Sequence, residues 1–174
     1  MAYVNNPNQV PDKSICDLNG RQTYLGQNFI YSAVGTYAST SEGILYLLQN
    51  PVSNANPPKA IFQDFKKLTC LTASQYLIFK FYANPTITST GTSLTPTNLR
   101  VASSVTASAK LFNSSNFTVS ANGIYLGALG SNFLVPDMSH VLSIFDAGNS
   151  LLITAQASQA SATTYSTELS WFEL

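Results

Sequence analysis

Charge is scarce in this sequence. Only 9% of its 174 residues are Asp, Glu, Lys or Arg, compared with about 25% in an ordinary globular chain. Eight basic and eight acidic residues give a formal net charge of zero at pH 7. Nucleic-acid binding requires clustered Lys and Arg, so we expect no nucleic-acid partner. So little charge also does little to prevent self-association, and we interpret the surface as one largely covered in an assembly. A merely polar monomer surface is the alternative.

The residues of common catalytic and metal sites are also few. His140 is the only histidine, and no Gly-x-Ser-x-Gly nucleophile motif occurs. Cys16 and Cys70 alone make neither a disulfide framework nor a zinc site. Asp137 and Asp146 flank a strand in the manner of turn residues rather than of paired glycosidase carboxylates. We therefore expect a non-catalytic protein that uses no cofactor or metal.

Long apolar runs are missing as well. No stretch approaches the 18 or so apolar residues of a membrane helix, so we expect no membrane partner. The first residues, MAYVNNPNQVP, show neither the basic region nor the apolar region of a secretory signal. We expect assembly in a cytoplasm.

From Asn28 onward, short apolar segments alternate with turn-forming residues such as Asn84-Pro85 and Asn122-Gly123. No segment combines helical periodicity with helix caps. This pattern predicts an all-β fold with antiparallel sheets, a sandwich formed by residues 27–174. The predicted strands are residues 28–36, 43–49, 59–70, 75–83, 98–112, 116–128, 131–136, 139–145, 150–157 and 163–173.

Residues 1–26 differ from the rest of the chain. They are polar, contain Pro7, Pro11 and Gly20, and fit neither a helical nor a strand period. We interpret them as an extended arm that docks on another chain, with a disordered tail as the alternative. The apolar residues expected to make that contact are Tyr3, Val4, Val10, Ile15 and Tyr24.

Some predicted strands are apolar on both faces. Residues 43–48 and 76–82 show this pattern, and the adjacent side chains of Trp171 and Phe172 point to opposite faces of a strand. Each strand of a two-layer sandwich has one core face, so a second apolar face needs cover from a loop or another subunit. We favour another subunit. The residues expected at that interface are Tyr46, Tyr76, Tyr82, Trp171 and Phe172.

One stretch of sequence resembles a known group. Residues 81–100 read FYANPTITSTGTSLTPTNLR, preceded by EGILYLLQNP at 42–51 and followed by SLLITAQAS at 150–158 and LSWFE at 169–173. This combination resembles small virion proteins of tailed phages. The resemblance covers residues 42–174 and implies a tumour-necrosis-factor-like jelly roll that assembles as a homotrimer on the capsid or tail. It implies no catalytic residue.

Two functions of different kinds follow. The first is a capsid decoration protein that binds the major capsid protein and stabilises the assembled shell. The alternative is a receptor-binding or glycan-binding module of a tail or fibre, with residues 50–58, 84–97 and 146–149 contacting the host. Both locate the protein on the virion. A polysaccharide-degrading enzyme is the least favoured interpretation.

Overall fold

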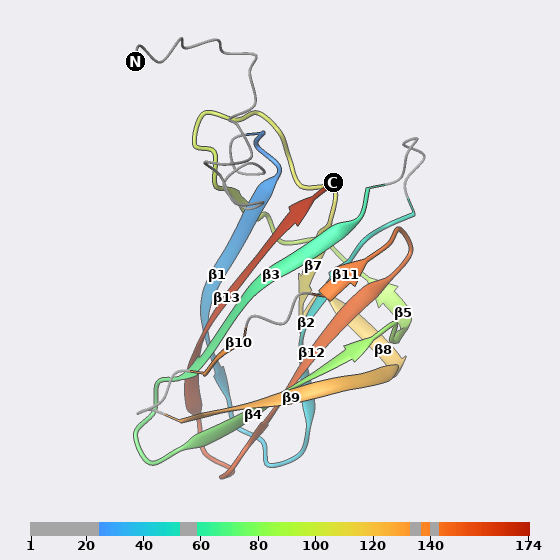
Figure 1. Cartoon of the computed structure of the whole chain (residues 1–174). Helices are drawn as coiled ribbons and strands as arrows, with labels where there is room; N and C mark the ends of the chain where they lie inside the picture. Colours follow the sequence, from blue (N-terminus) through green and yellow to red (C-terminus); the bar gives the residue numbers. More distant parts are fainter. Residues whose placement is uncertain (1–24, 53–58, 133–136, 140–142) are drawn as a thin grey trace, which may run out of the picture.

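The computed structural model describes residues 25–52, 59–132, 137–139 and 143–174. Within these ranges every regular element is a β-strand, and all the strand pairs are antiparallel (Figure 1). The predicted all-β fold with antiparallel sheets is therefore confirmed. No helix in the described part of the chain has the length and apolar character needed to cross a membrane.

Two large sheets form the sandwich. The first sheet has the order β10-β3-β13-β1-β6, with β11 also paired to β3. Its strands are β1 (Asn28–Tyr37), β3 (Ile61–Cys70), β6 (Thr97–Asn98), β10 (Asp137–Ser139), β11 (Ser143–Phe145) and β13 (Thr163–Glu173). The second sheet has the order β7-β2-β12-β4-β9. Its strands are β2 (Gly43–Gln49), β4 (Tyr76–Ala83), β7 (Lys110–Asn113), β9 (Ile124–Asn132) and β12 (Ser150–Ala157).

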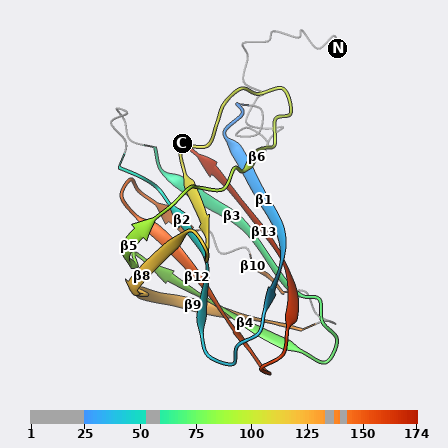
Figure 2. The same cartoon turned by 180° about the vertical axis from the view of Figure 1, so that it is seen from behind.

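The strand pairs are nested along the chain. The first long strand, β1, pairs with the last, β13, and β2 pairs with β12. Further inward, β3 pairs with β10 and β11, and β4 pairs with β9. Most connections between these strands cross from one sheet to the other, so strands far apart in sequence become neighbours (Figures 1 and 2).

The main core lies between the two sheets. Inward positions of β13 alternate in the manner of a strand, and Tyr165, Leu169 and Trp171 all enter this core. Trp171 is fully buried and its ring centroid lies 6.1 Å from that of Phe29 on β1. Burying a large apolar side chain contributes about 1.5–3 kcal/mol, so this core supplies most of the driving force for folding.

A second, smaller core explains why β2 is apolar on both faces. A two-stranded ribbon, β5 (Thr86–Thr90) with β8 (Phe117–Ala121), lies on the side of the second sheet away from the first (Figures 1 and 2). Leu47 of β2 and Leu152 of β12 are buried there against Phe112 and Phe117. From the sequence, either a loop or another subunit could cover this second apolar face of β2. The chain's own insertion between β4 and β9 provides it, so the expected subunit is wrong for this face of β2.

Other strand predictions also need correction. Residues 98–112 are not one strand, because 99–109 form a loop whose end is held by the side chain of Glu173. Residues 86–90 form a strand within a stretch expected to be a connection. Residues 116–128 are divided by a turn at Gly123, which has a φ of 90°. A side chain at this glycine would collide with the backbone carbonyl of Ala83.

Candidate functional site

The structure buries three of the expected interface residues within one chain. Trp171 is 0% exposed, Phe172 is 2% exposed and Tyr46 is 4% exposed. Trp171 and Tyr46 belong to the main core. The expectation that one member of the Trp171–Phe172 pair faces outward is wrong, because this chain covers both faces of β13 at that point.

The other expected interface residues are partly accessible. Tyr76 is 40% exposed, and its ring lies across Gly130 of β9, in the space where a Cβ atom would stand. Tyr82 is half-buried and packs at the margin of the second core. The expected arm contacts lie outside the described residues, as does the side chain of His140. Those arm positions are Tyr3, Val4, Val10, Ile15 and Tyr24.

A different set of residues forms an exposed apolar surface. Ile124, Tyr125 and Leu126 are consecutive on β9 and are 67%, 56% and 51% exposed, and Ile144 of β11 is 55% exposed. Leu126 and Ile144 also line a common hollow of about 270 Å³. We call these four residues the apolar edge. Leu126 and Ile144 adjoin one another at this hollow, and adjoining exposed apolar side chains are typical of an interaction site.

A β-bulge explains why Leu126 points outward. Phe81 of β4 is opposite Gly127 and Tyr82 is opposite Tyr125, so Leu126 is the additional residue on β9. A bulge redirects the side chain at that position and increases the local twist of the strand. Sequence analysis missed this surface because residues 116–128 were taken as one strand. The available signal was the run Ile124-Tyr125-Leu126 directly before a glycine.

A polar cluster surrounds Glu42, which comes just before β2. Its carboxylate accepts hydrogen bonds from Lys80 Nζ at 2.6 Å, Thr154 Oγ1 at 2.7 Å and Tyr82 Oη at 2.8 Å. Partial burial tends to raise the pKa of Glu42, but these donors outweigh it and hold the pKa below its ordinary value. Because the donors are already engaged, the cluster ties β2, β4 and β12 together on the outer face of the second sheet.

A second carboxylate closes the end of the sandwich. Glu173 is completely buried, and it accepts hydrogen bonds from the backbone amides of Ser108 and Ala109 at 2.9 Å. Trp171 Nε1 donates to the same carboxylate at 3.4 Å, and Lys59 Nζ lies 3.8 Å away. Glu173 therefore fixes the 99–109 loop against the last strand, which is a structural role.

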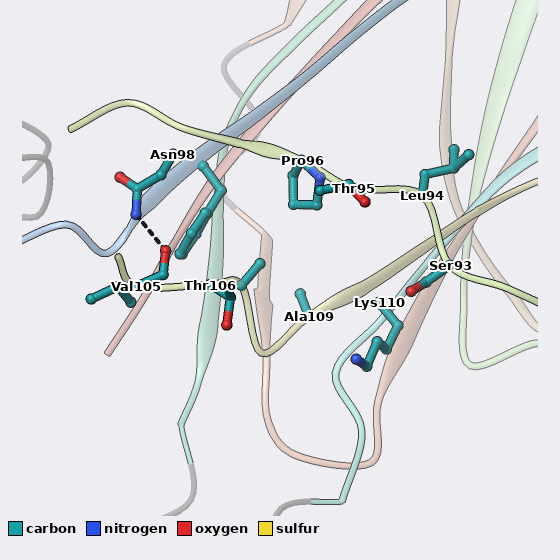
Figure 3. A pocket seen from close by; sticks show the side chains of 11 residues that line it. Ser93, Leu94, Thr95, Pro96, Asn98, Val105, Thr106, Ala109 and Lys110 are labelled. Atoms are coloured by element: carbon teal, nitrogen blue, oxygen red, sulfur yellow. Dashed lines mark hydrogen bonds between the residues drawn. The ribbon is translucent and has the colours of Figure 1, made fainter. Parts of the chain in front are cut away.

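The 99–109 loop and the preceding connection enclose a pocket of about 290 Å³ (Figure 3). Phe29 of β1 lies in its lining, and Leu94, Pro96 and Val105 add apolar surface. Asn98 fixes the geometry, because its Nδ2 donates to the carbonyls of Gly26 and Val105 at 2.9 Å. We call this space the loop pocket.

The protein therefore belongs to the class of antiparallel β-sandwiches, with an apolar edge at β9 and β11 and a small pocket at one end. Among the described residues, no group of three or more His, Cys, Asp and Glu side chains is placed to hold a metal ion.

No family model and no curated protein matches the sequence. A solved structure of infectious bursal disease virus, Gx strain, is 10% identical, with a TM-score of 0.16. That match covers 84% of this chain and 40% of the viral chain, and so low a TM-score supports no conclusion about fold or function.

Proposed function

We propose that this chain is a non-catalytic structural subunit of a tailed-phage virion. It assembles as a homotrimer and binds the major capsid protein of the assembled shell as a decoration protein. The observation that carries the self-association is the apolar edge, because it provides an uncharged contact surface on the sandwich. The virion role follows from the resemblance of residues 42–174 to small phage virion proteins.

The strand pairing supports a jelly roll as the architecture of this subunit. A jelly roll arises when a long antiparallel pair of strands wraps around a two-sheet core, so that first pairs with last and second with penultimate. The pairs β1–β13, β2–β12, β3–β10/β11 and β4–β9 follow this rule. Two short strands, β6 and β7, extend the two sheets at their edges.

Self-association through the apolar edge is energetically reasonable. Covering the exposed half of each of its side chains contributes about 1 kcal/mol apiece. That is enough for the centre of an interface, whose polar rim adds specificity rather than affinity. Contact between this edge and a different surface of the next copy forms a ring when the rotation between copies closes, and the proposed trimer is such a closed ring. The number three comes from the family resemblance.

Binding to the assembled shell is the second part of the proposal. A protein that binds only the closed shell stabilises it by mass action, because opening the shell requires release of the bound copies. Residues 1–26 are the segment proposed to reach the capsid surface. The work of such a protein is mechanical and needs no catalytic group.

The oligomer test compares Leu126→Asp with Val101→Asp. Leu126 belongs to the apolar edge, whereas Val101 is 99% exposed on the 99–109 loop. Light scattering at micromolar concentration should give a trimer for the unmodified chain and for Val101→Asp, and a monomer for Leu126→Asp. A stable monomer of the unmodified chain would refute self-association. A stable dimer would refute only the number.

The virion test is the location of the protein in an image of the particle. A decoration protein occupies many equivalent positions on the shell. The alternative function, a glycan-binding module of the tail, has support from the loop pocket, which is lined in part by residues 93–96 of a proposed host-contact loop. That function predicts few copies at the tail and binding of the purified chain to a glycan array.

A further inference from the structure

We propose that the loop pocket is the docking site for the N-terminal segment, residues 1–24, of the same chain. The proposal concerns one subunit, and it holds or fails independently of the virion function and of trimer formation.

The walls of the loop pocket are fixed by contacts within the subunit. The amide of Leu94 donates to the carbonyl of Leu111 at 2.7 Å, which attaches one wall to β7. The amide of Ala109 donates to buried Glu173, which attaches the other wall to β13. Asn98 connects the two walls through the carbonyl of Val105 (Figure 3). Because these walls are already ordered, binding a ligand costs little free energy for ordering them.

The lining suits apolar side chains on an extended peptide. Phe29, Leu94, Pro96 and Val105 supply apolar contacts, and hydroxyl groups such as that of Thr106 supply hydrogen bonds for a peptide backbone. The volume of about 290 Å³ is at the lower limit of ligand pockets, which span roughly 300–1,000 Å³. It therefore accommodates one or two amino-acid side chains.

The place where the chain leads into β1 indicates which segment occupies the loop pocket. Asn98, which lines the pocket, donates from Nδ2 to the carbonyl of Gly26 at 2.9 Å. Ser103 closes on the other side of Gly26 and leaves no room for a side chain there. The segment that precedes residue 25 is thus attached at the rim of the pocket.

The sequence of the segment fits this pocket. It carries apolar residues separated by polar ones: Tyr3, Val4, Val10, Ile15 and Tyr24. Attachment at the rim gives the segment an effective concentration in the millimolar range, so a weak contact suffices for docking. Reach is not limiting, because an extended chain spans about 3.3–3.6 Å per residue. Docking on its own subunit differs from the sequence-based expectation that this segment docks on another chain. A segment docked in this pocket must leave it before it can contact the capsid shell.

The test uses the native cysteine of the segment in the full chain. Cys16 lies in residues 1–24, and Cys70 is completely buried, so it does not compete in mild oxidation. Thr106→Cys places a second thiol at the pocket, and Ser120→Cys places one at an exposed position on β8. We expect the disulfide with Cys16 to form at least about tenfold faster for Thr106→Cys, at a rate independent of protein concentration. Non-reducing electrophoresis and peptide mass spectrometry measure the bond.

A pocket-filling change completes the test. Ser93→Trp, added to Thr106→Cys, should reduce the rate to that of the Ser120→Cys control while circular dichroism remains unchanged. Equal rates for the two cysteine variants would overturn the proposal. A concentration-dependent disulfide between two chains would assign the pocket to a neighbouring copy and would also overturn it. So would an oligosaccharide that binds the unmodified chain and is lost in Ser93→Trp.

Discussion

The carboxylate of Glu173 accepts a hydrogen bond of 2.9 Å from the backbone amide of Ala109, and both residues are buried. This bond joins the last strand to a loop of the β4–β9 insertion, far away in the sequence. Glu173→Ala leaves the amides of Ser108 and Ala109 without an acceptor. Because an unsatisfied buried donor costs about 1–3 kcal/mol, we expect the free energy of unfolding to fall by about 3 kcal/mol. Urea denaturation measures it.

Glu168→Ala is the control for that change. Glu168 is on the same strand but is only half-buried, and a change there should cost less than about 0.5 kcal/mol. Equal losses for Glu173→Ala and Glu168→Ala would contradict the structural role of the buried carboxylate.

The Glu42–Lys80 pair predicts a dependence of stability on acid pH. The pKa of Glu42 is lowered in the folded protein from its ordinary value of 4.5, so the folded state binds this proton less readily than the unfolded state. The contribution to stability is therefore present above that value and is lost as the pH falls through the folded-state pKa. Its size is at most about 1 kcal/mol, because the pair is partly solvated.

Glu42→Gln tests this dependence. Its unfolding free energy should be lower than that of the unmodified chain at pH 7, and the difference should shrink below pH 4 or so. Denaturation curves at several pH values give the comparison. A difference that stays constant over the acid range would show that the carboxylate charge contributes nothing.

Position 35 of β1 has room only for glycine, because the ring of Tyr165 on β13 lies against it. A Cβ atom at position 35 would stand 2.6 Å from Tyr165 Oη and 2.7 Å from Cζ. Tyr165 is 6% exposed and its ring packs edge-on against that of Phe79, so it has little space to move. We expect Gly35→Ala to lower the free energy of unfolding by about 1–3 kcal/mol through overpacking. Gly91→Ala, with its nearest neighbour atom at 3.3 Å, should cost less.

Phe172 belongs to the folded subunit rather than to an exposed interface. Since it is only 2% exposed, Phe172→Ala should lower the free energy of unfolding by about 3–5 kcal/mol. At a temperature where the variant is folded, light scattering should give the same mass as for the unmodified chain. If the variant folds but loses the oligomeric state of the unmodified chain, Phe172 contributes to the interface between subunits.

Several long strands were predictable because their sequence patterns are local. Residues 43–49, 150–157 and 163–173 were predicted at the bounds that the structure shows for β2, β12 and β13. Leu151, Ile153 and Ala155 stand at alternate positions of the sequence, the spacing of one strand face, and all three side chains belong to the main core. Such patterns need no knowledge of the partner strand.

The candidate site was not predictable in the same way. Phe117 looks like any strand aromatic, yet its place in the second core depends on where the β5–β8 ribbon folds back. Leu126 is exposed because of a register shift against β4, and a register is a property of two strands together. Trp171 and Phe172 alternate as the sequence requires, but alternation does not say what covers each face.

The sequence by itself determined the all-β class, most of the long strands and the core face of several of them, because strand period and turn chemistry are encoded over a few residues. Tertiary structure alone decided that β5–β8 covers the second sheet, that Leu126 joins Ile144 at an exposed edge, and that Glu173 closes the loop pocket. Each of these depends on contacts between segments distant along the chain. The free energy of such contacts depends on the whole packing arrangement and not on any local pattern.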